Sequence, residues 1–344
     1  MMRPFFRPCL GLAGVLLAWV IFPSAADDRL LMRISVENVA DHFQARTVQR
    51  FSEILSARSG GTILVDFRPA ARFFRDADVT AALARGDVEM AAPGIWQFDR
   101  SVPDTAALML PSVYARPSEI MHALVDGPLG ASLEGNIEKG LDVKVLGRWL
   151  DLGYGQLFGV GKPITRISDI KGRTIRVAGG RGNEERIRAL GASPVSIPSP
   201  DLPNYLGKGL IDGILSTFET VDSAGLDVLG LRSALEDNEY YPFYVPLVSA
   251  AFWKRLTPAQ RSLVTSAWDE VIGPAREEAQ AAQMAARARL VERGMRVTVP
   301  SPSETEATRI SLISQEDGMA SRLGVTPAIL ILLREQLARL KTDR

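Results

Sequence analysis

Short β-branched runs alternate with helical patterns along most of this chain, and that alternation constrains the fold more than any other feature. Strands are predicted in the first part at residues 30–36, 62–67, 88–92 and 142–149. Helical patterns separate them at residues 42–57, 76–85, 118–125 and 129–139. In the first helix, Val48, Phe51 and Leu55 share one face. The order β-α-β-α-β-α-α-β predicts a mostly parallel sheet with helices on both faces.

The same pattern begins again in the middle of the chain. Strands are predicted at residues 174–177, 194–197 and 209–215, and helices at residues 184–190 and 201–207. The apolar run YYPFYVPLVSAAFW, residues 240–253, then favours a return to the first unit. The length of the chain is also typical of two domains. We therefore expect an α/β protein with two domains.

A long helical stretch follows, at residues 257–294. Thr257 is a good N-cap, Pro258 suits the first helical position, and Gln260 completes a capping box. Pro274 is expected to break or kink this helix, and Gly294 to end it. Two short helices are expected in the tail, at residues 304–313 and after Pro327.

The N-terminus has the layout of a cleaved secretory signal over residues 1–26. Arg3 and Arg7 precede an apolar run at residues 10–22, and small residues follow at 24–26. The only cysteine, Cys9, precedes the apolar run, so the mature chain has none and a lipid anchor is disfavoured. We expect a periplasmic protein held by its hydrophobic core instead of disulfides.

The charge balance excludes one class of partner. The chain has 40 basic and 40 acidic residues, so it lacks the basic excess that grips nucleic acid. No segment after the signal is long and apolar enough to span a membrane.

The residues that catalysis usually requires are scarce. The mature chain has two histidines, His42 and His122, no cysteine, and no HExxH or GxSxG motif, so a zinc site or a Ser-His-Asp triad is poorly supported. We expect no cofactor and no metal. His42 is more typical of a helix end or an interface than of a general base.

Gly179, Gly180 and Gly182 follow a strand and open a helix, but their spacing fits neither of the nucleotide-binding motifs GxGxxG and GxxxxGK(S/T). These glycines favour a loop whose backbone lies close to another part of the chain over a phosphate-binding loop.

Arg176 differs from the other arginines near these glycines, because it lies at the end of a predicted strand. Ligands of open α/β sheets bind beyond the carboxyl ends of strands, and a guanidinium matches a carboxylate. The alternative is an internal salt bridge with Asp169, Asp212 or Glu219. The pattern leaves both interpretations open.

Three segments of the second unit are KPITRISDIKGRTIRV, LGASPVSIP and LGKGLIDG, at residues 162–177, 190–198 and 206–213. They resemble motifs of the DctP family, the extracytoplasmic solute-binding proteins of TRAP transporters. The segments RFSEILSARSGGTILVDFRPAARF, ARGDVEMAAPG and FWKRLTPAQRSLVTSAW extend the resemblance to about residues 31–335. Several independent motifs thus occur in the same order as in the family.

The resemblance implies a two-lobed periplasmic binding protein fold of class II type, with hinge strands and a long helix that spans the domains. Domain I would comprise residues 27–152 and 242–280, and domain II residues 153–241 and 281–344. The lobes would close on a small organic acid and deliver it to a small four-span and a large many-span membrane subunit. A monomer without catalytic activity is expected. The family's arginine that pairs with the substrate carboxylate matches Arg176.

The chain also departs from the family pattern. Gln156 stands where many members carry a second basic residue, PAARFF at residues 69–74 replaces a glycine-rich loop, and Ala178 and Gly179 follow the R-V pair. Further cleft candidates are taken from strand ends: Glu37, Trp96, Gln97, Ser216, Phe218 and Glu219. Phe218 and Trp96 are equally consistent with hinge packing, and Glu37 and Glu219 with solvated or paired acids. If both acids face the cleft, they favour a hydroxylated or amino-bearing acid over a plain dicarboxylate.

Two other functions are compatible with parts of this pattern. A protein of the same fold could serve a sensor kinase, which a neighbouring histidine-kinase gene would favour. A periplasmic enzyme such as a lyase is disfavoured by the scarcity of histidine and cysteine.

Overall fold

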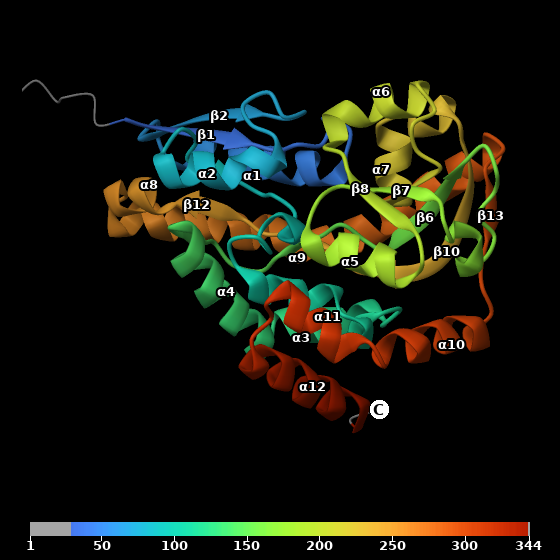
Figure 1. Cartoon of the computed structure of the whole chain (residues 1–344). Coiled ribbons are helices and arrows are strands. Elements are labelled where there is room, and N and C mark those ends of the chain that lie inside the picture. The colour runs from blue at the N-terminus through green and yellow to red at the C-terminus, as the bar shows by residue number, and fades with distance from the viewer. Residues whose placement is uncertain (1–28, 343–344) are drawn as a thin grey trace, which may run out of the picture.

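The computed structural model describes residues 29–342 and arranges them in two lobes, each built on its own sheet (Figure 1). The predicted signal at residues 1–26 lies outside the described residues. The first sheet has the strand order β2-β1-β3-β12-β4 and the second β13-β10-β6-β9-β7-β8. Each sheet is covered by helices, and the two meet around a central helix, α9.

The first sheet is mixed. Its strands are β1 (Leu30–Ser35), β2 (Ile63–Arg68), β3 (Met90–Ala91), β4 (Val143–Val145) and β12 (Leu247–Ser249). Strand β1 runs parallel to β2 and β3, as the β-α-β pattern predicts. Strand β12 inserts antiparallel between β3 and β4, because the chain returns to this sheet from the other lobe.

The second sheet shows the same mixture. Its strands are β6 (Gly155–Val160), β7 (Thr174–Val177), β8 (Ser193–Ser196), β9 (Gly213–Ser216), β10 (Leu231–Tyr240) and β13 (Arg296–Thr298). Strand β7 is parallel to β8 and β9, whereas β6 is antiparallel to β9 and β10. Strand β10 also pairs parallel with β13. The mostly parallel prediction therefore holds except for one strand in each sheet, β12 in the first and β6 in the second, which runs antiparallel to both of its neighbours.

Two strand crossings and one helix connect the lobes. A two-stranded pair, β5 (Leu150–Asp151) with β11 (Phe243–Tyr244), precedes β6 and follows β10. Helix α9 (Pro258–Glu292) contacts α1 in the first lobe and α7 in the second. Its 35 residues span about 52 Å at 1.5 Å per residue. The expected capping box at its start is present.

Helix α9 continues through Pro274 as one element, so the expected break does not occur. Proline deprives a helix of one backbone hydrogen bond, and the packing on both sides of the residue compensates. Val264 and Trp268 before it lie in the core of the first lobe, and Ala286 and Leu290 after it lie in the core of the second.

The remaining helices cover the sheets. They are α1 (Phe43–Arg58), α2 (Asp76–Arg85), α3 (Ser118–Val125), α4 (Pro128–Leu141), α5 (Arg181–Ala189), α6 (Leu202–Gly207), α7 (Phe218–Ser223), α8 (Ala250–Arg255), α10 (Pro302–Ile313), α11 (Glu316–Leu323) and α12 (Pro327–Thr342). Short 3-10 turns include η1 (Ile95–Gln97), η2 (Pro103–Met109) and η5 (Ser199–Asp201). The face of α1 predicted from Val48, Phe51 and Leu55 is fully buried.

The C-terminal helices pack on the first lobe. Helix α12 contacts α3, α4 and η2, and α11 contacts η2 (Figure 1). The expected division assigned residues 281–344 to domain II. Helix α11 also contacts α5 of the second lobe, and apolar side chains of α11 and α12 are buried in a core that contains residues of both lobes, among them Met319, Leu323 and Leu333. The boundary between the domains remains a prediction.

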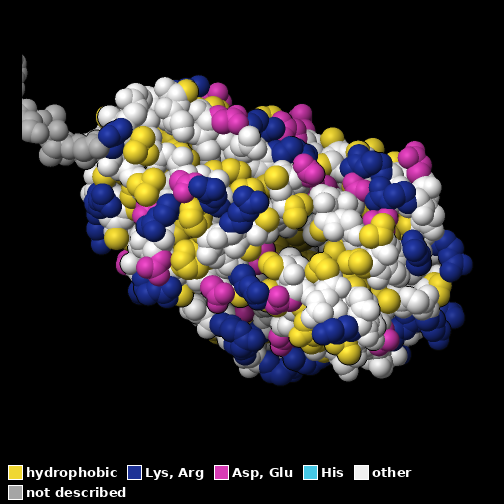
Figure 2. All heavy atoms as spheres, turned by 90° about the horizontal axis from the view of Figure 1, so that it is seen from above, with side chains coloured by type: hydrophobic (Ala, Val, Ile, Leu, Met, Phe, Trp, Pro, Cys, Tyr) yellow, Lys and Arg dark blue, Asp and Glu magenta, His cyan; other side chains and the backbone are white. Residues whose placement is uncertain are grey.

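Charges of both signs occur on the face of the molecule seen from above (Figure 2). Figure 2 shows basic and acidic side chains interspersed on the face viewed from above, with a hollow near its middle. Between residues 29 and 342, no helix combines the length and hydropathy needed to traverse a bilayer.

Candidate functional site

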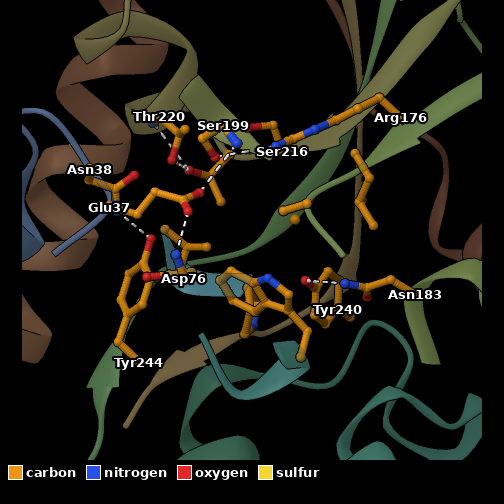
Figure 3. A pocket seen from close by; sticks show the side chains of 17 residues that line it. Glu37, Asn38, Asp76, Arg176, Asn183, Ser199, Ser216, Thr220, Tyr240 and Tyr244 are labelled. Atoms are coloured by element: carbon orange, nitrogen blue, oxygen red, sulfur yellow. Dashed lines mark hydrogen bonds between the residues drawn. The ribbon is translucent and has the colours of Figure 1, made fainter. Parts of the chain in front are cut away.

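A cavity lies between the two lobes, at the carboxyl ends of strands from both sheets (Figure 3). The space between atoms in it, open solvent included, is about 520 Å³. The lining residues are Glu37, Asn38, Asp76, Trp96, Leu152, Gly155, Arg176, Ala178, Asn183, Ser199, Leu215, Ser216, Thr217, Thr220, Tyr240, Pro242 and Tyr244. Only three of them carry charged side chains: Arg176, Glu37 and Asp76.

Arg176 is a buried cation near the end of β7, with 2% of its surface exposed. Its Nε donates to the carbonyl oxygen of Ile197 at 2.8 Å, and its Nη2 donates to the hydroxyl of Ser199 at 3.2 Å. A guanidinium has five N–H donors, so three remain available. Burial lowers the pKa of Arg176 to about 10, although the negative charge of Glu37 opposes that shift. The side chain is therefore still protonated at neutral pH.

No protein carboxylate neutralises this cation. Within the described part of the chain, no carboxylate oxygen lies within 4.0 Å of the Arg176 guanidinium. The three proposed partners are engaged elsewhere. Asp169 accepts from Thr165 and Arg166, Asp212 accepts from the backbone N–H of Thr174, and Glu219 pairs with His42. The internal salt bridge left open by the sequence is absent.

Glu37 faces Arg176 from the first lobe. It follows β1, and its carboxylate accepts the backbone N–H of Asp76 at 2.7 Å and that of Ser199 at 3.2 Å. Asp76 begins α2 in the first lobe, whereas Ser199 begins η5 in the second. Glu37 therefore joins the two lobes inside the cavity, and Ser199 lies between it and Arg176 (Figure 3).

Asp76 places a second carboxyl group beside Glu37. Its Oδ2 accepts the backbone N–H of Gly94 at 3.2 Å, and no donor among residues 29–342 reaches its Oδ1. Burial, and then the negative charge of Glu37, raise the pKa of Asp76 well above its usual range. This carboxyl group therefore keeps its proton to a higher pH than an exposed aspartate does.

Polar groups complete the lining. Asn38 donates to the hydroxyl of Tyr244 at 2.6 Å, and Asn183 donates to that of Tyr240 at 3.4 Å. Among the lining residues, two buried atoms have no hydrogen-bond partner within the described chain, the indole Nε1 of Trp96 and Oδ1 of Asn183. The wall of the cavity thus offers hydrogen-bond donors and acceptors as well as one cation.

The glycine cluster after β7 is a close-approach loop between the lobes, as its spacing favours. Gly180 has a φ of +85°, and a Cβ on it would lie 2.5 Å from the carbonyl oxygen of Trp96 in the first lobe. The backbone N–H of Gly182, in the first turn of α5, donates to the carboxylate of Asp99 at 2.7 Å. Because Asp99 occupies the start of this helix, a phosphate does not fit there.

Four of the nine proposed site residues line the cavity: Arg176, Glu37, Trp96 and Ser216. Two others lie at its edge. Gln97 donates to the carbonyl oxygen of Ala178 across the lobes at 3.2 Å. A Cβ on Gly179 would meet the side chain of Gln97 at 2.9 Å.

The other three lie away from the cavity. Gln156 exchanges hydrogen bonds with Asn238 and lines a separate hollow beside α9. Phe218 packs edge-on against Phe158 at 5.4 Å, in the core of the second lobe. The Glu219 carboxylate lies 2.6 Å from Nε2 of His42 and accepts the backbone N–H of Phe43 at 2.9 Å. His42 is thus an interface residue, as its position in the sequence suggests.

The sequence missed several lining residues, above all Asp76, Asn183, Ser199 and Tyr244. Asn183 and Ser199 follow β7 and β8 by only a few residues, so the strand-end rule could have found them. Asp76 resembled an ordinary acidic residue in the first turn of a helix, and Tyr244 belonged to an apolar run. Neither pattern reveals a position at the cavity.

Comparison with known proteins shows to which family the chain belongs. The profile of the bacterial extracellular solute-binding proteins, family 7, known as DctP, matches residues 34–320. The chain belongs to this family. It is 24% identical over 307 residues to the C4-dicarboxylate-binding periplasmic protein DctP of Rhodobacter capsulatus, and the match covers 87% of this chain and 89% of that protein.

Two solved structures show the same two-lobed fold. One is the sugar acid binding protein DctPAm of Advenella mimigardefordensis in complex with galactonate, with a TM-score of 0.83, 18% identity, and coverage of 90% of this chain and 99% of that one. The other is a TRAP periplasmic solute-binding protein of Sulfurospirillum deleyianum with bound succinate, with a TM-score of 0.82, 19% identity, and coverage of 89% and 98%. Members of this family are substrate-binding receptors of the periplasm.

Proposed function

We propose that this protein is a periplasmic receptor that binds a small organic acid between its lobes and delivers it to the membrane subunits of a TRAP transporter. One observation carries the proposal. Arg176 is a buried cation with three unused donors and no carboxylate partner in the described chain. A buried charge is costly unless it is paired, and a carboxylate ligand would supply the missing anion.

The contacts between the lobes support a closing mechanism. Glu37 reaches Ser199, Gln97 reaches Ala178, Asp99 reaches Gly182, and Glu219 reaches His42. All of these contacts would separate when the cleft opens. A ligand that touches both lobes shifts the population toward the closed state.

The family supplies the remaining parts of the proposal. The relatives named above bind a C4-dicarboxylate, galactonate or succinate, all of which are carboxylates. A signal at residues 1–26 would be removed on export to the periplasm, and the mature receptor would act as a monomer without catalysis. The small four-span and large many-span subunits of a TRAP transporter would receive the acid.

A thermal-shift screen of the mature chain tests the binding step. Sugar acids, keto acids, aromatic acids and dicarboxylates are compared with neutral sugars of similar size. A ligand at ~100 times its dissociation constant stabilises the fold by ~2.7 kcal/mol, so at least one acid should raise the unfolding midpoint while the neutral sugars do not. Stabilisation by neutral sugars alone would contradict the proposal.

Delivery needs its own test. Vesicles that contain the two membrane subunits and an ion gradient should accumulate the labelled acid only when this receptor is added. Equal uptake with and without the receptor would contradict the transport role.

A further inference from the structure

The two lobes contribute different numbers of charged side chains to the cavity. The second lobe contributes one cation, Arg176, and the first lobe contributes two carboxyl groups, Glu37 and Asp76. Both acids are buried, with 8% and 5% of their surfaces exposed. A molecule held between the lobes therefore meets a cation on one side and two acids on the other (Figure 3).

Only one carboxylate of a ligand can be neutralised here. Arg176 is the only basic residue among the lining residues, and Gln156, at the position of a possible second cation, is hydrogen-bonded to Asn238 outside the cavity. A second carboxylate on the ligand would approach Glu37 and Asp76, where like charge repels it and its acceptor oxygens meet acceptor oxygens.

The same wall suits a hydroxyl group. Glu37 uses its oxygens for two backbone N–H groups and keeps further lone pairs, and Oδ1 of Asp76 is unused within the described chain. The remaining lone pairs of both acids can therefore accept hydrogen bonds from hydroxyl groups of a ligand. The lining adds six hydroxyl groups, from Ser199, Ser216, Thr217, Thr220, Tyr240 and Tyr244.

We propose that the cleft selects a monocarboxylate that carries hydroxyl groups, as an aldonic acid does, and that Glu37 and Asp76 exclude dicarboxylates of the same length. This inference rests on the proposed carboxylate-binding function and narrows its substrate class. Arg176 fixes the carboxylate, and the two acids of the first lobe bind the hydroxyls at the other end. The receptor thus differs in specificity from relatives that bind C4-dicarboxylates.

Matched acids test the inference by calorimetry on the unchanged protein. D-Gluconate is compared with D-glucarate, D-galactonate with galactarate, and L-threonate with L-tartrate, since each pair shares a carbon skeleton and differs in one terminal hydroxymethyl or carboxylate. Hexanoate lacks the hydroxyls. We expect a hydroxylated monocarboxylate to bind at least about tenfold more tightly than its diacid and than hexanoate.

Variants connect the selectivity to the two acids. Asp76→Asn and Glu37→Gln remove a carboxyl group at nearly constant volume, so the ratio of affinities for monoacid and diacid should fall severalfold in each. Asp87→Asn is the control, because Asp87 is an exposed acid of the same lobe paired with Arg85. Its ratio should equal that of the unchanged protein.

The contrary outcomes are separable. A diacid that binds the unchanged protein as tightly as the matched hydroxy acid, with binding lost in Arg176→Ala, overturns this inference and leaves the carboxylate receptor intact. Failure of every acid to bind at millimolar concentration overturns the proposed function and this inference with it. The comparison of acids on the unchanged protein does not depend on whether a variant folds.

Discussion

The carboxylate of Glu219 in the second lobe lies 2.6 Å from Nε2 of His42 in the first, and both side chains are almost completely buried. Glu219 also accepts the backbone N–H of Phe43, in the first turn of α1. One carboxylate of the second lobe thus serves both the N-cap residue and the first turn of a first-lobe helix. Asp99 makes the reciprocal contact from the first lobe to the first turn of α5. Carboxylates at helix N-termini interact favourably with the helix dipole.

Removing the Glu219 charge should therefore favour the open state. We expect Glu219→Gln to increase the radius of gyration of the ligand-free protein in X-ray scattering and to weaken acid binding, because the closed state loses a buried, charge-assisted contact. Asp87→Asn provides the control, since Asp87 is exposed and distant from the contact with His42. An unchanged radius together with unchanged affinity would show that this contact does not hold the lobes closed.

The glycine loop gives a second test of closure. Gly180→Ala should weaken acid binding by at least about tenfold, because its Cβ would lie 2.5 Å from the carbonyl oxygen of Trp96 and keep the lobes apart. Gly172→Ala is a matched control: Gly172 also has a positive φ, of 72°, but no atom lies within 4 Å of its Cβ position. Both variants carry backbone strain, so equal loss of affinity in the two would argue against a steric block between the lobes.

The buried carboxyl group of Asp76 predicts a pH dependence of stability. Its folded pKa is raised by burial and by Glu37, so the unfolded chain releases this proton first as the pH rises. The free energy of unfolding therefore decreases as the pH rises from the pKa of the unfolded chain, about 4, to the pKa of the folded state. Asp76→Asn should raise the free energy of unfolding at neutral pH and flatten its decline in urea titrations between pH 5 and 8. Parallel pH profiles for the two proteins would contradict the assignment.

Pro274 in α9 provides a prediction about stability. Proline in a helix interior costs about 3 kcal/mol through a lost hydrogen bond and a clash. Pro274→Ala should therefore raise the free energy of unfolding, by up to about 3 kcal/mol if the helix can keep its path between the lobes. Urea denaturation measures the change. A loss of stability would show instead that the packing of both lobes requires the geometry that proline imposes.

Much of the fold could be predicted because its elements carry local signals. Helices α2 and α3 and strand β7 have the predicted bounds, and the cap at Thr257 is where the sequence places it. Helix α11 was missed, because only four of its eight residues are buried and its pattern is short. Strand β12 inserts antiparallel because the chain returns to the first sheet from the second lobe. No local sequence pattern indicates such a long-range connection.

The site was predicted less completely, for a physical reason. Strand ends indicate where a side chain emerges, so Arg176, Glu37 and Ser216 could be found. The orientation of a helix that follows a strand is set by packing. Phe218 and Glu219 begin α7, which turns Phe218 into the core and Glu219 toward His42, whereas α2 presents Asp76 to the cavity.

Calorimetry of Arg176→Ala tests the central claim most directly, with the tightest-binding acid of the screen as titrant. Loss of one partner from a buried ion pair costs about 3 to 5 kcal/mol, so affinity should fall by at least about two decades. Arg176→Lys should be intermediate, because an ammonium keeps the charge but cannot form the two-pronged contact. Circular dichroism confirms that both variants fold. Near-normal binding by a folded Arg176→Ala protein would contradict the claim that this buried guanidinium binds the carboxylate of the ligand.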